Sequence, residues 1–373
     1  MKKIRVLETI RQGKIGGGES HVLDLSLNLD KEKYAPIVLS FTSGPMIDLL
    51  KKRKIIASII YTESAFDFKI WKKVKEFIVK EKIDIIHAHG TRAMSNVFWA
   101  AKKLNIPIIY TVHGWSFHLD QKFLVRKVRE SMEKYLTSKA TKTICVSYSN
   151  QKDGETLFNL KRSTVIYNAV DFEKFNLLRS YKDIRTELNI AKDKTLIGYI
   201  VRVTGQKDPF TMVQAMKIVA EREKNIVLLM VGDGDLKDQI VQMAKDLNLG
   251  KQIVFQPFRT DVPDLLNAID IYCLPSLWEG FPIGIIEAMA MKKTVVASPV
   301  DGNSELVEDG KTGITVPIKD SEKLANVLID LHNDNTKRTD LANAGYNFIT
   351  QNFGIKRMVD EIEKLYYSVH SNK

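Results

Sequence analysis

The chain has 373 residues, of which 44% are hydrophobic and 27% are charged, and its formal net charge is +11. This composition is typical of a soluble globular protein, and the length favours two domains over a single core. No apolar run approaches the roughly 20 residues that a membrane-spanning helix needs, and no signal peptide is recognised, so we expect a cytoplasmic protein. Cys145 and Cys273 lie in apolar runs and are expected to be buried thiols.

The excess of positive over negative charge lies entirely in the first half of the chain. Residues 1–170 contain 30 Lys and Arg against 16 Asp and Glu, whereas residues 171–373 contain 26 against 29. Such asymmetry indicates two different surfaces. A solvated Lys-rich surface explains the excess as well as an anionic membrane surface or an anionic acceptor does. We expect no nucleic-acid partner, because the cations are dispersed and no helix-turn-helix, finger or RNA-binding signature accompanies them.

Apolar β-branched runs alternate with helical patterns along the whole chain. In the first half, strands are predicted at residues 3–10, 36–41, 55–60, 83–87, 107–112, 143–146 and 165–167. In the second half, they are predicted at residues 195–201, 226–231, 253–256, 271–274, 294–297 and 314–316. Continuous apolar strands separated by helices predict parallel sheets covered on both faces. We therefore predict an α/β protein with two doubly wound, Rossmann-like domains facing a central cleft, with the boundary near Val170.

A glycine run follows the first predicted strand, at Gly16-Gly17-Gly18-Glu19-Ser20, and opens a helix. Glycine lets the backbone approach a ligand closely, and a helix N-terminus favours negative charge. The run is not a G-x-G-x-x-G fingerprint, so it does not support binding of a nicotinamide dinucleotide. A plain flexible loop remains the alternative.

Three histidines follow neighbouring predicted strands. His87 and His89 end one strand, and His113 ends the next. A lone histidine in such a place is more often structural, but three together favour a ligand-facing role. Their spacing does not match an H-E-x-x-H zinc site, and no cysteine lies near them in the sequence, so we predict no metal site.

Two cations, Arg202 and Lys207, share the loop after the predicted strand 195–201, and Asp208 is the expected N-cap of the next helix. Arginine can bind phosphate bidentately and lysine as a point charge, so the pair can hold a diphosphate. A surface salt bridge is the alternative. Farther on, Val231-Gly232-Asp233-Gly234-Asp235 predicts a tight strand-to-helix turn with Asp235 as N-cap, in preference to a metal-binding pair of aspartates.

The most informative stretch is Glu279-Gly280-Phe281-Pro282-Ile283-Gly284-Ile285-Ile286-Glu287. Pro282 suits the first helical position, and the amides that follow it should point out of the helix N-terminus toward an anion. The two glutamates would repel that anion, so neutral hydroxyls of a sugar or ribose suit them better. This stretch predicts a site for a phosphate-linked sugar, and His113 is then our candidate for a polar group that touches the reacting sugar.

Together these motifs resemble the retaining GT-B glycosyltransferases of family 4, over almost the whole chain. The resemblance rests on the order and spacing of Gly16-Gly17-Gly18-Glu19, Thr111-Val112-His113-Gly114, Tyr167-Asn168-Ala169-Val170-Asp171, Arg202 with Lys207, Val231-Gly232-Asp233-Gly234, and Glu279-x7-Glu287. It implies an acceptor-side domain at residues 1–170 and a donor domain at 171–353. It also implies that residues 354–373 form a helix that crosses back to the first domain.

The resemblance also implies a role for each site residue. Arg202 and Lys207 would bind the diphosphate, Glu287 the ribose, and Glu279 the donor sugar together with the distal phosphate. His113 would contact the transferred sugar, so that the implied catalytic residues are His113, Glu279, Arg202 and Lys207. The remaining implied donor contacts, largely made by backbone, are Gly17, Gly18, Gly232, Phe258 (toward the base), Gly280, Phe281, Ile283 and Gly284.

The implied reaction moves a hexose or N-acetylhexosamine from a UDP- or GDP-linked donor to an acceptor hydroxyl with retention, and it needs no metal or other cofactor. The acceptor is expected to be a glycan or a lipid-linked intermediate of cell-surface polysaccharide or glycoconjugate synthesis, with a soluble acceptor as the alternative. The basic first domain is compatible with a peripheral position at the inner face of the cell membrane. Two alternatives remain. One is another GT-B enzyme, such as a nucleotide-sugar epimerase or a phosphorylase, and the other is a non-catalytic protein that binds a sugar or a membrane surface.

Three positions depart from the family's usual pattern. Gly205-Gln206-Lys207-Asp208 replaces a Lys-Gly ending, Ala169 replaces a glycine, and Asp301 stands where glycine is common. We expect none of these departures to touch the charged core of the site.

Overall fold

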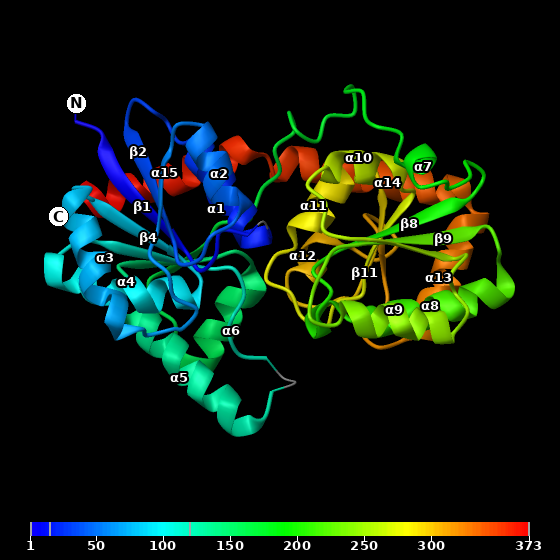
Figure 1. Cartoon of the computed structure of the whole chain (residues 1–373), viewed down its shortest axis with the longest axis horizontal. Coiled ribbons are helices and arrows are strands. Elements are labelled where there is room, and N and C mark those ends of the chain that lie inside the picture. The colour runs from blue at the N-terminus through cyan, green and yellow to red at the C-terminus, as the bar shows by residue number, and fades with distance from the viewer. Residues whose placement is uncertain (1, 15, 119–120, 372–373) are drawn as a thin grey trace. The chain divides into compact units, whose positions relative to one another are not determined.

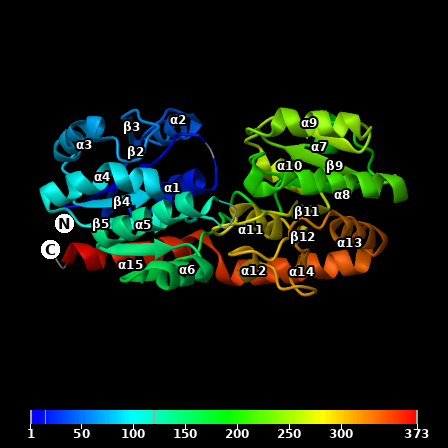
Figure 2. The same ribbon diagram turned by 90° about the horizontal axis from the view of Figure 1, so that it is seen from below.

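The computed structural model describes residues 2–14, 16–118 and 121–371. The chain divides into two compact units. Unit 1 comprises residues 1–169 together with 355–373, and unit 2 comprises residues 170–354. Each unit is built around one parallel sheet with helices on both faces (Figures 1 and 2). The predicted fold class, two doubly wound α/β domains, is confirmed.

The sheet of unit 1 has seven strands in the order β3-β2-β1-β4-β5-β6-β7. The strands are β1 (Ile4–Ile10), β2 (Tyr34–Ser40), β3 (Ile56–Ile59), β4 (Ile85–His89), β5 (Ile108–Val112), β6 (Lys142–Cys145) and β7 (Ser163–Val165). The chain builds outward from β1 through β2 and β3, and then starts again on the other side of β1 with β4. The strand order therefore reverses between β1 and β4, and such a switch point is where open α/β sheets bind ligands.

Seven helices flank this sheet among the described residues. They are α1 (Gly17–Asn28), α2 (Pro45–Lys52), α3 (Phe68–Lys80), α4 (Thr91–Leu104), α5 (Phe123–Lys139), α6 (Tyr148–Phe158) and α15 (Ile355–Ser371). Side chains alternate between the two faces of a strand, so Val6 packs toward α1 and α15 while Leu7 packs toward α3 and α4. The last helix thus belongs to the core of unit 1, where Ile362 and Tyr366 are fully buried.

The sheet of unit 2 has six strands in the order β10-β9-β8-β11-β12-β13. The strands are β8 (Thr195–Ile200), β9 (Ile226–Val231), β10 (Ile253–Gln256), β11 (Ile271–Leu274), β12 (Thr294–Ala297) and β13 (Ile314–Thr315). The reversal falls between β8 and β11. The helical segments are α7 (Ile184–Glu187), the 3₁₀ turn η1 (Gly205–Lys207), α8 (Pro209–Arg222), α9 (Lys237–Asp246), α10 (Val262–Ala268), α11 (Ile283–Ala290), α12 (Asn303–Leu306), α13 (Ser321–Asn333) and α14 (Asn335–Asn352).

The strand predictions hold closely, and the differences lie at strand ends. β4 continues to His89, two residues beyond its predicted end, and β7 begins at Ser163 instead of Val165. In the described part of the chain, no helix combines the length and the apolar character that a membrane crossing requires.

Candidate active site

The predicted donor-site residues of unit 2 all follow the carboxyl ends of parallel strands. Arg202 comes after β8, Gly232 after β9, Phe258 after β10 and Glu279 after β11. Because the carboxyl ends of parallel strands share one edge of the sheet, the fold collects these residues at that edge. The switch point lies between the loop that carries Arg202 and the loop that carries Glu279.

An ion pair bridges these two loops. The ammonium Nζ of Lys207 lies 2.5 Å from Oε1 of Glu279, and the hydroxyl of Ser276 donates to the same oxygen at 2.6 Å. The backbone is joined as well, since the amide of Leu277 donates to the carbonyl of Gln206 at 2.8 Å. Both charged side chains are largely shielded from solvent. The diphosphate-binding cation predicted on one loop is therefore already held by the sugar-binding carboxylate predicted on the other.

Two of the departures from the family pattern contact Glu279. The amide Nε2 of Gln206 lies 3.4 Å from Oε2 of Glu279, and the backbone amide of Glu279 donates to Oδ2 of Asp301 at 2.8 Å. The expectation that no departure touches the charged core is therefore wrong. It failed because the loop after β12 folds back onto the loop after β11. A Cβ on Gly302 would lie only 2.2 Å from the carbonyl oxygen of Gly280.

Helix α11 begins one residue later than predicted. Pro282 has an extended backbone (φ −76°, ψ 108°) and is the N-cap, so Ile283 is the first helical residue. The amide of Ile285 donates to the carbonyl of Pro282 at 3.2 Å and is not available to a ligand. The amides of Ile283 and Gly284 are then the ones that the helix geometry leaves for an anion. Gly284 is required here, because a Cβ would lie 2.3 Å from the hydroxyl oxygen of Tyr272.

Glu287 and Phe281 occupy different settings on either side of Pro282. Glu287 is half-buried, one turn inside α11. Burial, together with the charges of Glu287 and Glu279, raises the pKa of Tyr272 well above its ordinary value. Phe281 is buried and stacks on Phe353 with 5.6 Å between ring centroids. Its side chain therefore serves the core, and only its backbone can face a donor.

The loops after β9 and β10 also interlock. Gly232 has φ +134°, and a Cβ there would lie 1.9 Å from the carbonyl oxygen of Val201, so only glycine fits. The amide of Phe258 donates to Oδ2 of Asp233 at 2.9 Å. The predicted backbone contact of Phe258 with the base would therefore have to use its carbonyl oxygen.

The two predicted helix caps have opposite outcomes. Asp208 caps α8, because its Oδ1 accepts from the amide of Thr211 at 3.2 Å. Asp235 does not cap α9, because that helix begins two residues farther on, with Leu236 at the N-cap position. The amide of Leu236 donates back to the carbonyl of Val203 at 3.2 Å, which ties the residue before the helix to the loop after β8.

In unit 1 the three predicted histidines form a hydrogen-bonded chain that runs into the core. Nε2 of His113 lies 3.1 Å from Nδ1 of His89, and Nε2 of His89 lies 2.8 Å from Oε2 of Glu8. The hydroxyl of Tyr366 donates to Oε1 of Glu8 at 2.6 Å and lies 2.6 Å from Nδ1 of His87. β1, β4 and α15 thus hold His113 through a network whose inner members, unlike His113 itself, are buried.

A fourth histidine packs against His113 from α1. His21 has its ring centroid 4.9 Å from that of His113, and its Nδ1 lies 3.0 Å from Oδ1 of Asn168. The predicted glycine loop reaches the same place, since a Cβ on Gly18 would lie 3.5 Å from the His113 ring. Sequence reasoning missed His21, although its position on the helix that follows the glycine loop was a usable signal.

Burial decides the protonation of this network. It raises the pKa of Glu8 to about 8 and lowers the pKa of both His21 and His89 to about 3. Although His113 is only half-buried, desolvation by the surrounding protein, together with the neighbouring His21 and His89, lowers its pKa well below the ordinary value. The histidines are therefore neutral near pH 7, and each neutral ring offers one N–H donor and one acceptor nitrogen. His113 can form a hydrogen bond to a sugar hydroxyl without adding charge.

The same side chains approach one another as closely as metal ligands do. His21, His89 and His113 each bring one ring nitrogen within 4.8 Å of the other two, and Glu8, His87 and His89 form a second such group. The hydrogen bonds described above, including those between His21 and Asn168 and between His89 and Glu8, account for the short distances between these ligand atoms. The absence of a metal from the reaction stays a prediction.

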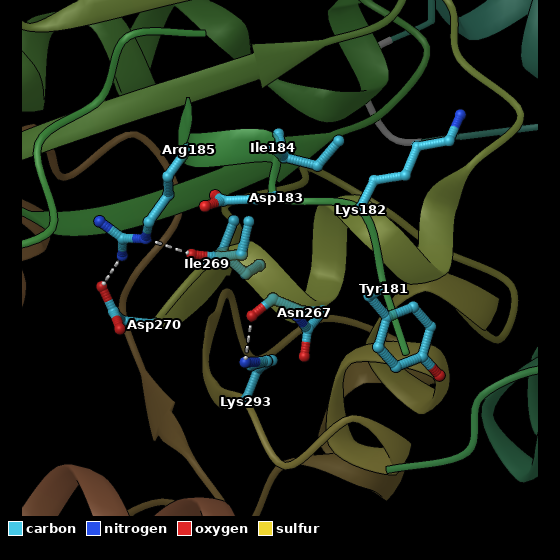
Figure 3. A pocket seen from close by; sticks show the side chains of 10 residues that line it. Tyr181, Lys182, Asp183, Ile184, Arg185, Asn267, Ile269, Asp270 and Lys293 are labelled. Atoms are coloured by element: carbon cyan, nitrogen blue, oxygen red, sulfur yellow. Dashed lines mark hydrogen bonds and ion pairs between the residues drawn. The ribbon is translucent and has the colours of Figure 1, made fainter. Parts of the chain in front are cut away.

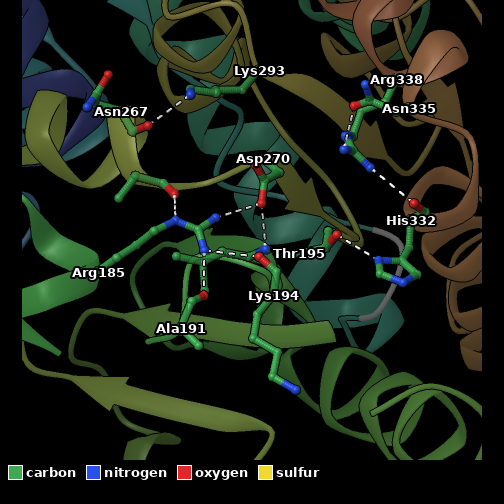
Figure 4. A network of polar contacts seen from close by, with 12 residues as sticks. Arg185, Ala191, Lys194, Thr195, Asn267, Asp270, Lys293, His332, Asn335 and Arg338 are labelled. Carbon is green, nitrogen blue, oxygen red and sulfur yellow. Dashed lines mark hydrogen bonds and ion pairs between the residues drawn. The ribbon is translucent and has the colours of Figure 1, made fainter. Parts of the chain in front are cut away.

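A pocket of about 300 Å³ in unit 2 lies at the amino ends of its strands, opposite the edge that carries Arg202 and Glu279. It is lined by residues 181–185, 267–270 and Lys293 (Figure 3). Arg185 anchors it through Asp270 at 2.7 Å and through the carbonyl of Lys194 at 3.0 Å, next to the amino end of β8 (Figure 4). These contacts fasten α7 to the sheet, and the pocket does not belong to the candidate site.

Both halves of the chain match known families. Residues 15–174 match the model described as Glycosyltransferase Family 4, and residues 180–348 match Glycosyl transferases group 1. The uncharacterized glycosyltransferase MJ1178 of Methanocaldococcus jannaschii is 30% identical over 79% of this chain and 78% of its own length. The Escherichia coli UDP-Gal:alpha-D-GlcNAc-diphosphoundecaprenol alpha-1,3-galactosyltransferase is 28% identical over 92% of each chain.

The fold has close counterparts among solved structures. Anabaena Alr3699/HepE in complex with UDP-glucose superposes with a TM-score of 0.87 at 23% identity, covering 98% of this chain and 100% of the other. WaaG, a glycosyltransferase involved in lipopolysaccharide biosynthesis, superposes with a TM-score of 0.77 at 14% identity, covering 96% and 99%. The chain belongs to the GT-B glycosyltransferases and is a glycosyltransferase enzyme.

Proposed function

We propose that this glycosyltransferase moves a hexose from a UDP-linked donor to a hydroxyl of a lipid-linked glycan, with retention at the anomeric carbon and without a metal ion. Two names support the uridine nucleotide, because the Escherichia coli relative is named for UDP-Gal and the Anabaena structure contains UDP-glucose. The same relative's name supports a diphospholipid-linked acceptor that carries N-acetylglucosamine. We therefore place UDP-galactose first among the donors.

The observation that carries the proposal is the ion pair between Lys207 and Glu279 at the switch point of unit 2. Glu279 lies on the loop that leads into α11. When the anomeric bond breaks, negative charge grows on the leaving diphosphate. A fixed ammonium and the first amides of a helix stabilise that charge without having to reorganise. Arg202, on the same loop as Lys207, supplies a second cation.

Glu279 has two functions in this proposal. In the ligand-free state its carboxylate holds the Lys207 ammonium in place. In the donor complex it accepts hydrogen bonds from sugar hydroxyls while it keeps the ammonium in place beside the phosphates. Glu287, one turn inside α11, accepts from the ribose hydroxyls. In unit 1, His113 contacts the transferred sugar, and the leaving diphosphate takes the proton of the acceptor hydroxyl.

Lipid-linked acceptors lie at a membrane, and the excess of Lys and Arg in residues 1–170 supports a membrane-associated unit 1. The reaction would then take place at the inner, anionic face of the cell membrane. Because the cations oppose the diphosphate charge, we expect turnover to persist in the presence of a chelator.

Two measurements test the proposal in sequence. Thermal shift against UDP-galactose, UDP-glucose, UDP-N-acetylglucosamine and GDP-mannose identifies the donor, because a ligand that binds only the folded state raises the melting temperature. Transfer is then assayed with N-acetylglucosaminyl diphospholipid, with and without EDTA, and the anomeric configuration of the product is read by NMR. Conversion of the donor to an isomer without the acceptor would replace transfer with an epimerase activity. Cleavage of a glycan by inorganic phosphate, without any nucleotide sugar, would replace it with a phosphorylase activity.

A further inference from the structure

The first two turns of α5 expose four apolar side chains to solvent. Phe123, Leu124, Val125 and Val128 are 70%, 77%, 44% and 68% exposed. Burial of such side chains is the main favourable term in folding, so four of them together in water indicate a surface that is covered in use. We call the segment 122–129 the α5 tip.

The rest of the helix explains why the tip is not part of the core. Farther along, Glu133, Leu136 and Thr137 are buried, and the hydroxyl of Tyr110 donates to Oε2 of Glu133 at 2.9 Å. Every residue of the α5 tip, by contrast, is exposed or half-exposed. The helix is thus anchored by its second half, and its first half extends beyond the body of unit 1 (Figure 1).

The α5 tip is also strongly cationic. It carries Lys122, Arg126, Lys127 and Arg129, and among the described residues Glu130 is the carboxylate that forms ion pairs with it. Glu130 accepts from Arg126 at 2.9 Å and from Lys127 at 2.7 Å, so a net positive charge remains. At about 3.6 residues per turn, the four apolar side chains cover one broad side of the helix. Lys122, Arg126 and Arg129 lie on the other side, whereas Lys127 lies on the apolar side, with its Nζ 5.9 Å from the centroid of the Phe123 ring.

We propose that the α5 tip docks into the interface of an anionic lipid bilayer. Helices with Phe or Leu on one face and Lys or Arg on the other lie in the headgroup region, where apolar contact and attraction to anionic lipid add together. A second copy of the chain is a poorer occupant, because two such tips would bring like charges together. The inference rests on the proposed function in that it assigns the membrane contact of unit 1 to one helix.

The test uses the full chain and vesicles of phosphatidylcholine, with or without phosphatidylglycerol. We expect the protein to sediment with the mixed vesicles and far less with phosphatidylcholine alone. The double variant Phe123→Ser, Leu124→Ser should bind mixed vesicles about tenfold more weakly or worse, because it removes two apolar side chains that would be buried in the bilayer. The matched control is Phe68→Ser on α3, an equally exposed aromatic at 75%, which should bind as the wild type does.

A second readout reports insertion directly. Both native cysteines are buried, so a single introduced cysteine can be labelled selectively. A polarity-sensitive fluorophore on Leu124→Cys should shift to the blue when mixed vesicles are added, whereas the same probe on Phe68→Cys should not. The proposal would be overturned if the Ser variant bound vesicles as the wild type does, or if the probe at position 124 did not shift. It would also be overturned if sedimentation velocity showed that copies of the chain associate through the α5 tip and bury it.

Transfer to a short-chain, water-soluble acceptor separates this inference from the proposed function. The α5 tip variants should keep wild-type turnover on that acceptor and lose it only on acceptor embedded in vesicles. If the wild type shows no transfer from any nucleotide sugar, the proposed function fails, while the vesicle experiment still decides the docking surface.

Discussion

The Lys207 ammonium and the Glu279 carboxylate meet at 2.5 Å, so the loops after β8 and β11 carry an ion pair across the switch point of unit 2. Replacing Lys207 by Ala removes a fixed cation from the leaving diphosphate and leaves the shielded carboxylate unpaired. We expect kcat to fall about 10²–10³-fold, the usual effect of losing one preorganised donor. Steady-state kinetics on the purified variant measure it.

The matched control for Lys207→Ala is Lys311→Ala. Lys311 forms an exposed ion pair with Glu308 at 2.8 Å, and such pairs contribute little. Its kinetics should equal those of the wild type. A folded Lys207→Ala enzyme with wild-type kcat would remove the diphosphate role from that loop.

Glu287 is predicted to bind ribose hydroxyls, and Glu287→Gln should weaken nucleotide binding about tenfold or more, because hydrogen bonds to charged groups contribute about 1.5–3 kcal/mol. The specific readout is competition by UDP and 2′-deoxy-UDP. The wild type should prefer UDP, and the variant should discriminate less. An undiminished preference in the variant would place the ribose elsewhere.

The Asp301 carboxylate holds the backbone amide of Glu279, and two substitutions of Asp301 should separate the effect of this hydrogen bond from the effect of changing the side chain. Asp301→Ala removes the acceptor for the Glu279 amide, so we expect a lower melting temperature and a higher KM for the donor. Asp301→Asn keeps an acceptor oxygen and tolerates the positive φ of 38°, so it should stay near the wild type. Equal behaviour of the two variants would show that the hydrogen bond is irrelevant to donor binding.

The pKa of Glu8 makes a prediction about stability and pH. Burial raises the pKa of this carboxyl from 4.5 to about 8 in the folded state. Between those values the folded chain keeps a proton that the unfolded chain has lost, so this group makes the unfolding free energy fall as the pH rises. Gln at position 8 stays neutral. The stability of Glu8→Gln relative to the wild type should therefore increase from about pH 5 to about pH 9.

Denaturant unfolding of the wild type and of Glu8→Gln at each pH measures how Glu8 contributes to the unfolding free energy. The pKa of His21 and His89 is lowered to about 3 in the folded state, so both stay neutral there throughout this range. Their titration in the unfolded chain is common to both proteins and cancels in the difference. A difference that is flat with pH would mean that Glu8 is ionised in the folded state throughout this range.

Gly284 gives a prediction that a second substitution should reverse. Gly284→Ala places a methyl group 2.3 Å from the Tyr272 hydroxyl oxygen and should lower the melting temperature by several degrees, a loss on the scale of overpacked cores of about 1–3 kcal/mol. Tyr272→Phe removes that oxygen and should restore most of the stability in the double variant. Failure of the rescue would place the clash in the backbone of α11 instead.

Much of the fold followed from the sequence because its signals are local. Apolar β-branched runs located the strands, and β9 to β12 have the predicted bounds. The Asp208-Pro209 cap was also predictable, because an N-cap and a following proline act within one helical turn. The roles of Arg202, Lys207, Glu279, Glu287 and His113 remain predictions.

The missed parts of the site depend on contacts distant in sequence. Tyr366 touches Glu8 across 358 positions, and no local pattern relates them. Asp301 was expected not to touch the charged core. It lies 22 residues from Glu279 in the sequence, yet the two loops follow the neighbouring strands β11 and β12. Asp235 was predicted to be the N-cap of a tight strand-to-helix turn, but the N-cap is Leu236, whose amide bonds to the distant Val203 carbonyl.

The placement of α15 has a consequence for how the chain is made. Unit 1 cannot complete its core until Tyr366 and its neighbours leave the ribosome, after every residue of unit 2 has been synthesised. During translation the nascent first unit therefore presents an uncovered apolar face beside Val6 and Ile85. A chaperone that shields this face should raise the yield of soluble enzyme, and supplying α15 as a separate peptide to a chain truncated before it should restore assembly.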